Sequence, residues 1–232
     1  MGLIFSSCFD WLGKNFLDHL EFYKKPYQTG KILTNLYTVE NRGTNIFIYS
    51  DGVNAICFDA GYDDDSRMDE FKRIGIAFNS ITHLFLTHSD VDHAEGIDLF
   101  HNAEIYLSAD EVQLINGSVA RGLGGLYFNK RIDTYRTLRD GDEIRIGDIT
   151  VRATATPGSM SYLVNDEILV CGDALILKNG CVEILWPIYN MDTEGMKRSI
   201  GRLAKLKGVK LMVTAHTGGT DRFEVAMKKW LE

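Results

Sequence analysis

The 232-residue sequence lacks the features that mark membrane-embedded, exported or disulfide-linked proteins. No stretch approaches the ~18 consecutive apolar residues that a membrane-spanning helix needs, and the first residues lack the basic start and cleavage site of a secretory signal. The four cysteines show no C-x-x-C spacing, and Cys57 and Cys171 lie within apolar runs typical of buried free thiols. Because free thiols persist in reducing compartments, we expect a cytoplasmic protein without a membrane partner.

The sequence also has too little positive charge to favour a nucleic-acid partner. Its 25 lysines and arginines are outnumbered by 32 aspartates and glutamates, which gives a formal net charge of -7. The densest basic group, between residues 197 and 210, recurs at the helical spacing of a solvated helix face. Because the excess acid would repel a phosphate backbone, we expect no nucleic-acid partner.

Two common catalytic motifs are missing as well. The glycine-rich stretch 117–125 is not flanked by the strand, the helix and the Lys-Ser/Thr pair of a phosphate-binding loop, so we interpret it as a lid or a linker. Residues 158–162, Gly-Ser-Met-Ser-Tyr, break the G-x-S-x-G pattern, which argues against a serine nucleophile.

The composition, with 45% hydrophobic and 25% charged residues, is that of an ordinary globular domain. The length predicts a single domain over residues 1–232, with an N-terminal helical extension at about 1–26. Within that extension, apolar residues at three- and four-residue spacing predict an amphipathic helix over residues 9–23, closed by Pro26. If this helix does not pack on its own domain, we expect it to form a homodimer or partner surface.

The rest of the chain predicts strands and helices that form α layers around β sheets. It starts with three β-rich runs separated by turn residues, a pattern typical of an antiparallel meander. The strands are expected at residues 32–39, 45–49, 55–58, 81–86, 105–107, 135–138, 143–146, 149–154, 161–164, 168–170 and 211–213. The helices are expected at residues 65–74, 94–100 and 194–206, and from Thr220 or Asp221 to Leu231.

Four potential metal ligands lie within six residues, directly after the strand expected at 81–86: His88, Asp90, Asp92 and His93. Imidazoles and carboxylates bind divalent metals, and a strand-to-helix loop can turn several of them toward one point. Aspartates also cap helix N-termini, and Asp90 or Asp92 could serve only in that way. Capping does not explain the histidines on both sides, so the stretch predicts a metal site.

These residues resemble the metallo-β-lactamase superfamily, whose members carry H-x-H-x-D-H after a strand, then T-P-G-H, then a G-D at a strand end, and a final histidine. His88, Asp92 and His93 match the first motif. Asp173 follows a predicted strand as the family's bridging aspartate does, and His216 resembles the final ligand.

The resemblance extends from Asn35 to His216, because Asp59-Ala60-Gly61 also matches the family's segment after its third strand. It implies an α/β fold, a four-layer αββα sandwich in which two mixed sheets are flanked by helices. It also implies a binuclear metal site with the ligands His88, Asp90, Asp92, His93, Asp173 and His216.

Two residues depart from the family pattern. Asp90 stands where the family has its second histidine, and Ser159 lies where T-P-G-H is expected. Either Ser159 replaces that histidine, or a tetrapeptide has been lost and Ser159 is the family's downstream serine. Both alternatives remove a histidine. The ligands that remain are, for the first metal position, His88, Asp90 and Asp173 and, for the second, Asp92, His93, His216 and the shared Asp173.

We expect a hydrolase in which one or two divalent ions polarise a small-molecule substrate and activate water to attack an ester, lactone, thioester or phosphodiester. Asp90 and Asp92 are the expected catalytic residues, with Asp90 acting as a ligand or, without the first ion, as a base. Zinc is the expected metal, and iron and manganese are alternatives because two carboxylates make a hard site.

Two other functions stay open. A related branch of the superfamily, which includes di-iron proteins that bind or reduce oxygen or nitric oxide, also has a carboxylate at the position of Asp90. The missing histidine is, in addition, what a non-catalytic binding domain with a depleted site would show, because fold does not dictate function.

Overall fold

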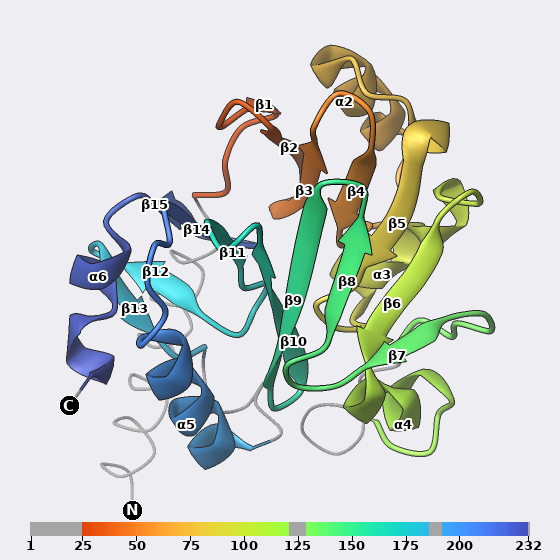
Figure 1. Cartoon of the computed structure of the whole chain (residues 1–232). Helices are drawn as coiled ribbons and strands as arrows, with labels where there is room; N and C mark the ends of the chain where they lie inside the picture. The colour runs from red at the N-terminus through yellow and green to blue at the C-terminus, as the bar shows by residue number, and fades with distance from the viewer. Residues whose placement is uncertain (1–24, 121–128, 186–191, 232) are drawn as a thin grey trace, which may run out of the picture.

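The computed structural model describes residues 25–120, 129–185 and 192–231, whose strands form two large sheets and one short hairpin (Figure 1). The first sheet has seven strands in sequence order, antiparallel from β1 to β4 and parallel from β4 to β7. Its strands are β1 (Gly30–Lys31), β2 (Leu36–Asn41), β3 (Thr44–Ser50), β4 (Ala55–Phe58), β5 (Ile81–Phe85), β6 (Glu104–Ser108) and β7 (Arg136–Leu138).

The second sheet has six strands in the order β15-β14-β11-β10-β9-β8, of which only β11 and β14 run parallel. Its strands are β8 (Glu143–Ile146), β9 (Ile149–Thr156), β10 (Ser159–Val164), β11 (Ile168–Val170), β14 (Leu211–Thr214) and β15 (Gly218–Thr220). The hairpin consists of β12 (Ile176–Lys178) and β13 (Cys181–Glu183).

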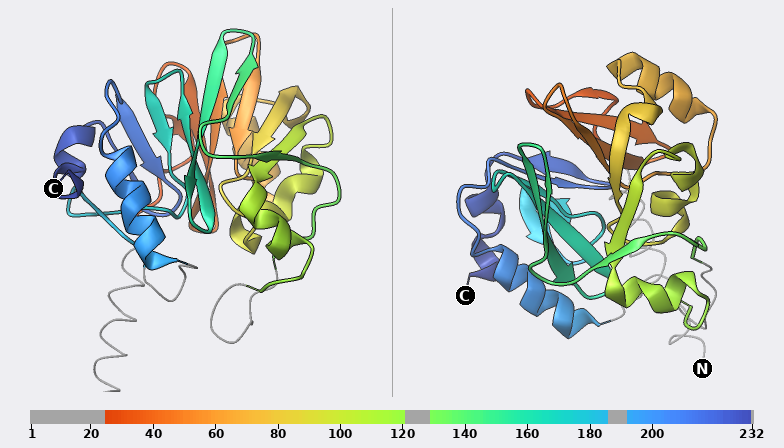
Figure 2. Two further views of the ribbon diagram at one scale, coloured as in Figure 1. Left: turned by 60° about the horizontal axis from the view of Figure 1, so that its bottom comes forward. Right: turned by 45° about the vertical axis from the view of Figure 1, so that its right-hand side comes forward.

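Helices cover the outer faces of both sheets, so the molecule has the four αββα layers implied by the sequence (Figure 2). The α-helices are α2 (Ser66–Ile74), α3 (Val91–Ala94), α4 (Val112–Ile115), α5 (Thr193–Leu203) and α6 (Phe223–Ala226). Short 3₁₀ helices lie at Phe78–Ser80, Glu95–Leu99, Ala109–Glu111 and Lys228–Trp230.

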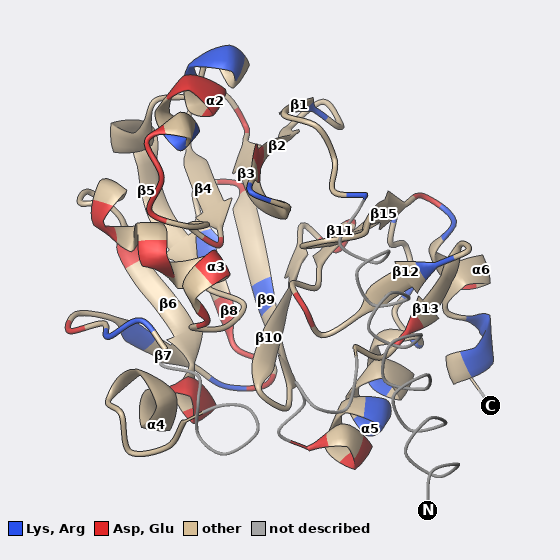
Figure 3. Cartoon of the chain, turned by 180° about the vertical axis from the view of Figure 1, so that it is seen from behind, with Lys and Arg blue, Asp and Glu red and all other residues tan. Residues whose placement is uncertain are grey.

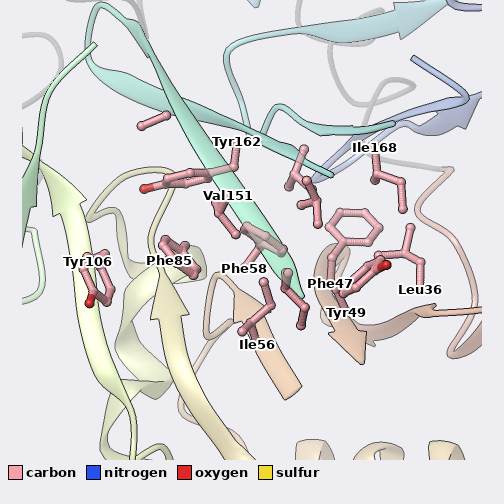
Figure 4. Packing of buried hydrophobic residues seen from close by; sticks show 14 of the residues in the cluster. Leu36, Phe47, Tyr49, Ile56, Phe58, Phe85, Tyr106, Val151, Tyr162 and Ile168 are labelled. Atoms are coloured by element: carbon pink, nitrogen blue, oxygen red, sulfur yellow. The ribbon is translucent and has the colours of Figure 1, made fainter. Parts of the chain in front are cut away.

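The main apolar core lies between the two sheets (Figure 4). Side chains of a strand alternate between its two faces, and β4 shows the effect on packing. Ile56 and Phe58 point into the core between the sheets, whereas Ala55 and Cys57 pack under the helices of the first sheet. The second sheet repeats the pattern in β10, where Tyr162 joins the central core and Leu163 packs under α5 and α6.

Three sequence expectations about elements are wrong. The run 32–39 is not one strand, because the backbone N–H groups of Ile32 and Leu33 both donate to the carbonyl of Leu36 and form a turn between β1 and β2. The helix expected at 94–100 is a one-turn α3 followed by a 3₁₀ helix. A Cβ on Gly96 would lie 1.5 Å from Nη1 of the buried Arg67, so the chain packs there as only glycine allows. The last helix is likewise split in two.

The basic residues between 197 and 210 do not share one helix face, because α5 ends at Leu203 and the lysines after it lie in the connection to β14. Acidic residues lie among the basic ones on this side of the molecule (Figure 3). Lys197 pairs with Glu194 at 2.6 Å, and Lys210 pairs with Glu167 at 2.5 Å. The residues expected to form the extension at about 1–26, and its helix at 9–23, lie almost wholly outside the described residues. Within the described part of the chain, no helix is long and apolar enough to cross a bilayer.

Candidate metal centre

The six side chains expected as metal ligands lie together at one edge of the two large sheets: His88, Asp90, Asp92, His93, Asp173 and His216. The first four come from the loop after β5 and from α3. The other two follow β11 and β14, which are parallel neighbours and therefore end at the same edge of the second sheet. The fold thus brings together segments more than 120 residues apart in the sequence.

Four of these side chains lie close together in a group that we call the second position: Asp92, His93, His216 and Asp173. Nε2 of His93 lies 3.4 Å from Oδ2 of Asp92 and 3.6 Å from Oδ1 of Asp173. Nε2 of His216 lies 3.3 Å from the same Asp92 oxygen and 3.2 Å from the same Asp173 oxygen. Ligand atoms around a tetrahedral ion with bonds near 2.0–2.1 Å are separated by about 3.3–3.4 Å. The donor set therefore fits a divalent ion such as zinc.

A smaller group beside it, the first position, shares Asp173. Nε2 of His88 lies 3.5 Å from Oδ2 of Asp90 and 3.9 Å from Oδ2 of Asp173. Asp173 therefore faces the two positions with different oxygens, as a bridging carboxylate does. The ligand atoms of His88, His93 and Asp173 also lie within 4.8 Å of one another. With one imidazole, the carboxylate of Asp90 and the shared carboxylate of Asp173, the first position is harder and poorer in nitrogen than the second.

Asp90 occupies the N-cap position of α3, but its side chain does not cap the helix. Its backbone is extended, with φ -66 and ψ 155, and its side chain makes no capping hydrogen bond to the helix. Instead, Oδ1 accepts a hydrogen bond from Nδ2 of Asn129 at 2.6 Å, while Oδ2 faces His88. The alternative that Asp90 serves only as a helix cap therefore does not hold.

Two imidazoles of the second position are held through Nδ1, which leaves Nε2 facing the other ligands. Nδ1 of His93 lies 2.8 Å from Oδ2 of Asp59, and Nδ1 of His216 lies 2.8 Å from the carbonyl oxygen of Gly43. Contacts of this kind fix the orientation and the tautomer of a metal-binding ring. Nε2 of His93 is buried and has no hydrogen-bond partner among the described residues, as expected of an atom that binds a metal ion.

Asp59 supports both positions at once. Besides contacting His93, its carboxylate accepts hydrogen bonds from the backbone N–H of Thr87 at 2.7 Å and from the Thr87 hydroxyl. The same hydroxyl lies 3.0 Å from Nδ1 of His88. The backbone of Asp59 has a φ of 62, a strained conformation that is common at functional sites. The Asp59-Ala60-Gly61 segment thus positions a ligand of each metal position.

Ser159 begins β10 at the place where the family's histidine was expected. Its buried hydroxyl donates to the carbonyl oxygen of Thr87 at 3.4 Å, beside the backbone bond from Met160 to the same oxygen at 2.7 Å. Ser159 therefore fastens β10 to the strand end that carries the ligand loop. Both alignments of this segment remain compatible with that contact.

Two supporting residues were missed by sequence reasoning, Asn129 and Glu111. The carboxylate of Glu111 is buried and accepts hydrogen bonds from the backbone N–H of Ser89 at 2.7 Å and from its hydroxyl at 2.6 Å. On the other side, the carbonyl oxygen of Ser89 accepts from the N–H of Lys130 at 3.1 Å. Ser89 lies between His88 and Asp90, so these contacts fix the backbone between two expected ligands.

The buried acids and imidazoles shift one another's protonation. Burial would raise the pKa of Asp173, but His216 and His93 hold that pKa well below its usual value. Burial would lower the pKa of His216, but hydrogen bonds and charges of Asp173 and Asp92 raise it to about 10. Burial opposes a charge on His93 too, yet Asp92, Asp59 and Asp173 raise its pKa well above the usual value. Without a metal, the second position is therefore a cluster of imidazolium and carboxylate ions.

An αββα sandwich with clustered histidines and aspartates at one edge defines a metal-binding class of protein. The sequence matches the family model of the metallo-β-lactamase superfamily over residues 39–216, and the chain belongs to this superfamily. The fold and family expected from the sequence are thereby confirmed.

One curated relative is a probable metallo-hydrolase of Methanocaldococcus jannaschii, which is 28% identical over 147 residues, or 63% of this chain and 62% of the relative. The match thus spans under two thirds of that protein. Among solved structures, a Cronobacter sakazakii metallo-β-lactamase described by a HARLDQ motif superposes with a TM-score of 0.67 at 21% identity, over 84% of this chain and 80% of its own. BJP-1, a subclass B3 metallo-β-lactamase of Bradyrhizobium japonicum, superposes with a TM-score of 0.64 at 16% identity, over 85% of this chain and 80% of that protein.

Metal binding to the metal-free protein is predicted to release protons. Because His93 and His216 have raised pKa values, both carry a proton at pH 7, whereas a metal binds neutral imidazole. We expect about two protons released for the ion in the second position, and an apparent affinity that rises with pH toward the His216 pKa of about 10. Zinc titrations by calorimetry in two buffers of different ionisation enthalpy measure this release; a value near zero contradicts the protonated cluster.

Glu111→Ala is predicted to weaken the first position. The substitution leaves the buried N–H of Ser89 without its acceptor, at a cost of about 1–3 kcal/mol, and loosens the backbone between His88 and Asp90. We expect a lower unfolding temperature and about tenfold weaker metal binding at the first position, measured by cobalt(II) titration. Glu111→Gln keeps an acceptor oxygen and is the control. Equal metal binding in Glu111→Ala and the native protein would contradict the supporting role.

Proposed function

We propose that this protein is a metal-dependent hydrolase that uses one or two divalent ions to cleave an ester, lactone, thioester or phosphodiester. The observation that carries the proposal is the set of four ligand atoms from Asp92, His93, His216 and Asp173, with spacings of 3.2 to 3.6 Å. Family membership and the relative named a probable metallo-hydrolase support the same chemistry. A bound divalent ion supplies Lewis acidity, which polarises a carbonyl or phosphoryl oxygen and lowers the pKa of water.

The six candidate ligands have different roles in this proposal. In our proposal, Asp92, His93 and His216 would hold an ion in the second position, with Asp173 shared between the two positions. His88 and Asp90 would complete the first position. With only the second position filled, the carboxylate of Asp90 would serve as a base for a water proton, because it lies partly exposed at the same edge.

The two positions differ in the metals that they favour. The second position offers two imidazoles, a donor set that suits zinc, and we propose zinc as its ion. The first position offers one imidazole and two carboxylates, which shifts preference toward harder ions such as manganese or iron(II). A mixed or partly filled centre is therefore part of the proposal.

A second candidate function is a di-iron protein that binds or reduces oxygen or nitric oxide. The observation in its favour is the carboxylate of Asp90 aimed at His88 in the first position. Iron in protein purified without added metal, together with an optical change on exposure to oxygen, supports this candidate. Zinc alone with no spectral response eliminates it.

Hydrolysis is predicted to depend on the bound metal and on His216. We expect the chelated protein to lose activity on a panel of esters, lactones, thioesters and phosphodiesters, and reloading with zinc, manganese or iron(II) to restore it. His216→Ala should lower kcat/KM by about 100-fold or more, because it removes a ligand of the second position. His101→Ala, which changes an exposed histidine outside the site, is the matched control.

The same experiment separates hydrolysis from the non-catalytic alternative. Full turnover by a preparation shown by elemental analysis to be metal-free contradicts the proposed mechanism. A metal-loaded protein inactive on the whole panel would favour the binding-domain interpretation instead.

Asp90→Asn is predicted to act on the first position only. The amide keeps the size of the side chain but removes the negative charge that faces His88. We expect weaker binding of manganese at the first position, while zinc in the second position is retained, and a lower kcat with little change in KM. Metal stoichiometry after dialysis measures the first effect. Loss of the tightly bound zinc as well would show that Asp90 belongs to the second position.

A further inference from the structure

The turn between β2 and β3 is fastened to the second metal position. The carbonyl oxygen of Gly43 lies 2.8 Å from Nδ1 of His216, and the hydroxyl of Thr44 donates to Oδ2 of Asp92 at 3.3 Å. The turn is tight, with φ of 54 at Arg42 and 90 at Gly43. Arg42, at its tip, is therefore placed next to residues that contact two of the expected ligands.

The guanidinium of Arg42 lies over the ring of Tyr62, with Cζ 4.5 Å from the ring centroid. Tyr62 directly follows Asp59-Ala60-Gly61, the segment that holds His93, and its N–H donates to the side-chain oxygen of Asn41 at 2.7 Å. Arg42 and Tyr62 therefore come from two loops that each support the second position. The ring restrains the arginine at the rim of the site, which reduces the entropy lost when the guanidinium binds a partner.

Among the described residues, no carboxylate lies within ion-pair distance, 4.0 Å, of the Arg42 guanidinium, which is exposed to solvent. Asp64 is near enough for Arg42 to lower its pKa, yet the two form no ion pair. The pKa of Tyr62 is raised first by burial and then by the charge of Asp92, so the phenol is within electrostatic reach of the metal centre. An unpaired cation thus stands beside the second position.

We propose that Arg42, held over Tyr62, binds an oxyanion of the substrate, so that the natural substrate is a small anionic molecule whose scissile group lies at the metals. The proposal rests on the proposed metal-dependent function and names its substrate class. In a protein of net charge -7, an anionic molecule needs a local cation to approach. The guanidinium presents a planar pair of donors that matches a carboxylate, and a phosphate or sulfonate oxygen pair fits it as well.

A matched pair of thiols tests the proposal without knowledge of the substrate. Thiolates bind zinc, and 3-mercaptopropionate carries a carboxylate where 3-mercapto-1-propanol carries a neutral hydroxyl. We expect zinc-loaded protein to bind the acid about tenfold more tightly than the alcohol, measured by calorimetry. In Arg42→Asn the preference should fall to about twofold or less with the affinity for the alcohol unchanged. Asparagine tolerates the left-handed conformation at this position, so the turn is kept.

Three further variants locate the effect. Arg42→Lys keeps the charge and should keep part of the preference. Tyr62→Phe keeps the ring beneath Arg42 and should keep most of it, whereas Tyr62→Leu should lose much of it. Arg145→Asn removes another exposed arginine, on β8, and should change nothing.

The possible failures are distinguishable. An unchanged preference for the acid in Arg42→Asn, or equal binding of both thiols by the native protein, overturns the role of Arg42 while leaving the metal centre intact. Zinc-loaded protein that binds neither thiol, or protein that takes up no zinc, contradicts the proposed function and this inference together.

Discussion

The structure of the site depends on one constraint: three buried imidazoles and three half-buried carboxylates lie together where the strands end. Carboxylates that have lost much of their water require positive charge nearby, because an ion loses its solvation when water is excluded. In the metal-free molecule, protons on His93 and His216 supply that charge, which is why the pKa values of both are raised. A divalent ion would supply the same charge from a single point, with protons released in exchange.

The rest of the fold keeps these groups in place. The apolar core between the sheets aligns the ends of β5, β11 and β14, so that each carries a ligand to the same edge. A surrounding layer of hydrogen bonds then orients the side chains. Asp59 holds His93, the carbonyl of Gly43 holds His216, and Glu111 holds the backbone beside His88. Rigid support of this kind is what metal sites need, since loose ligands weaken both affinity and catalysis.

The sequence predicted the fold, and it selected six candidate ligands that the structure brings together, because the signals for both are local. The loop from His88 to His93 follows an apolar strand directly, and the run at Ala55–Phe58 shows its strand through β-branched and aromatic residues. The supporting residues gave no such signal. Glu111 lies 22 residues from Ser89 and Asn129 lies 39 residues from Asp90, and only the tertiary fold brings each pair together. Arg42 looked like an ordinary turn residue in the sequence, and nothing in the sequence indicated that Gly96 would pack against the buried Arg67.

The central claim is that the four atoms of the second position surround an ion. The most direct measurement is a crystal structure of the zinc-loaded protein with anomalous diffraction recorded on both sides of the zinc absorption edge. The account predicts an anomalous peak about 2.0–2.2 Å from ligand atoms of Asp92, His93, His216 and Asp173. A zinc-loaded crystal with no peak among these residues, or with its strongest peak at a site that none of them contacts, would contradict it.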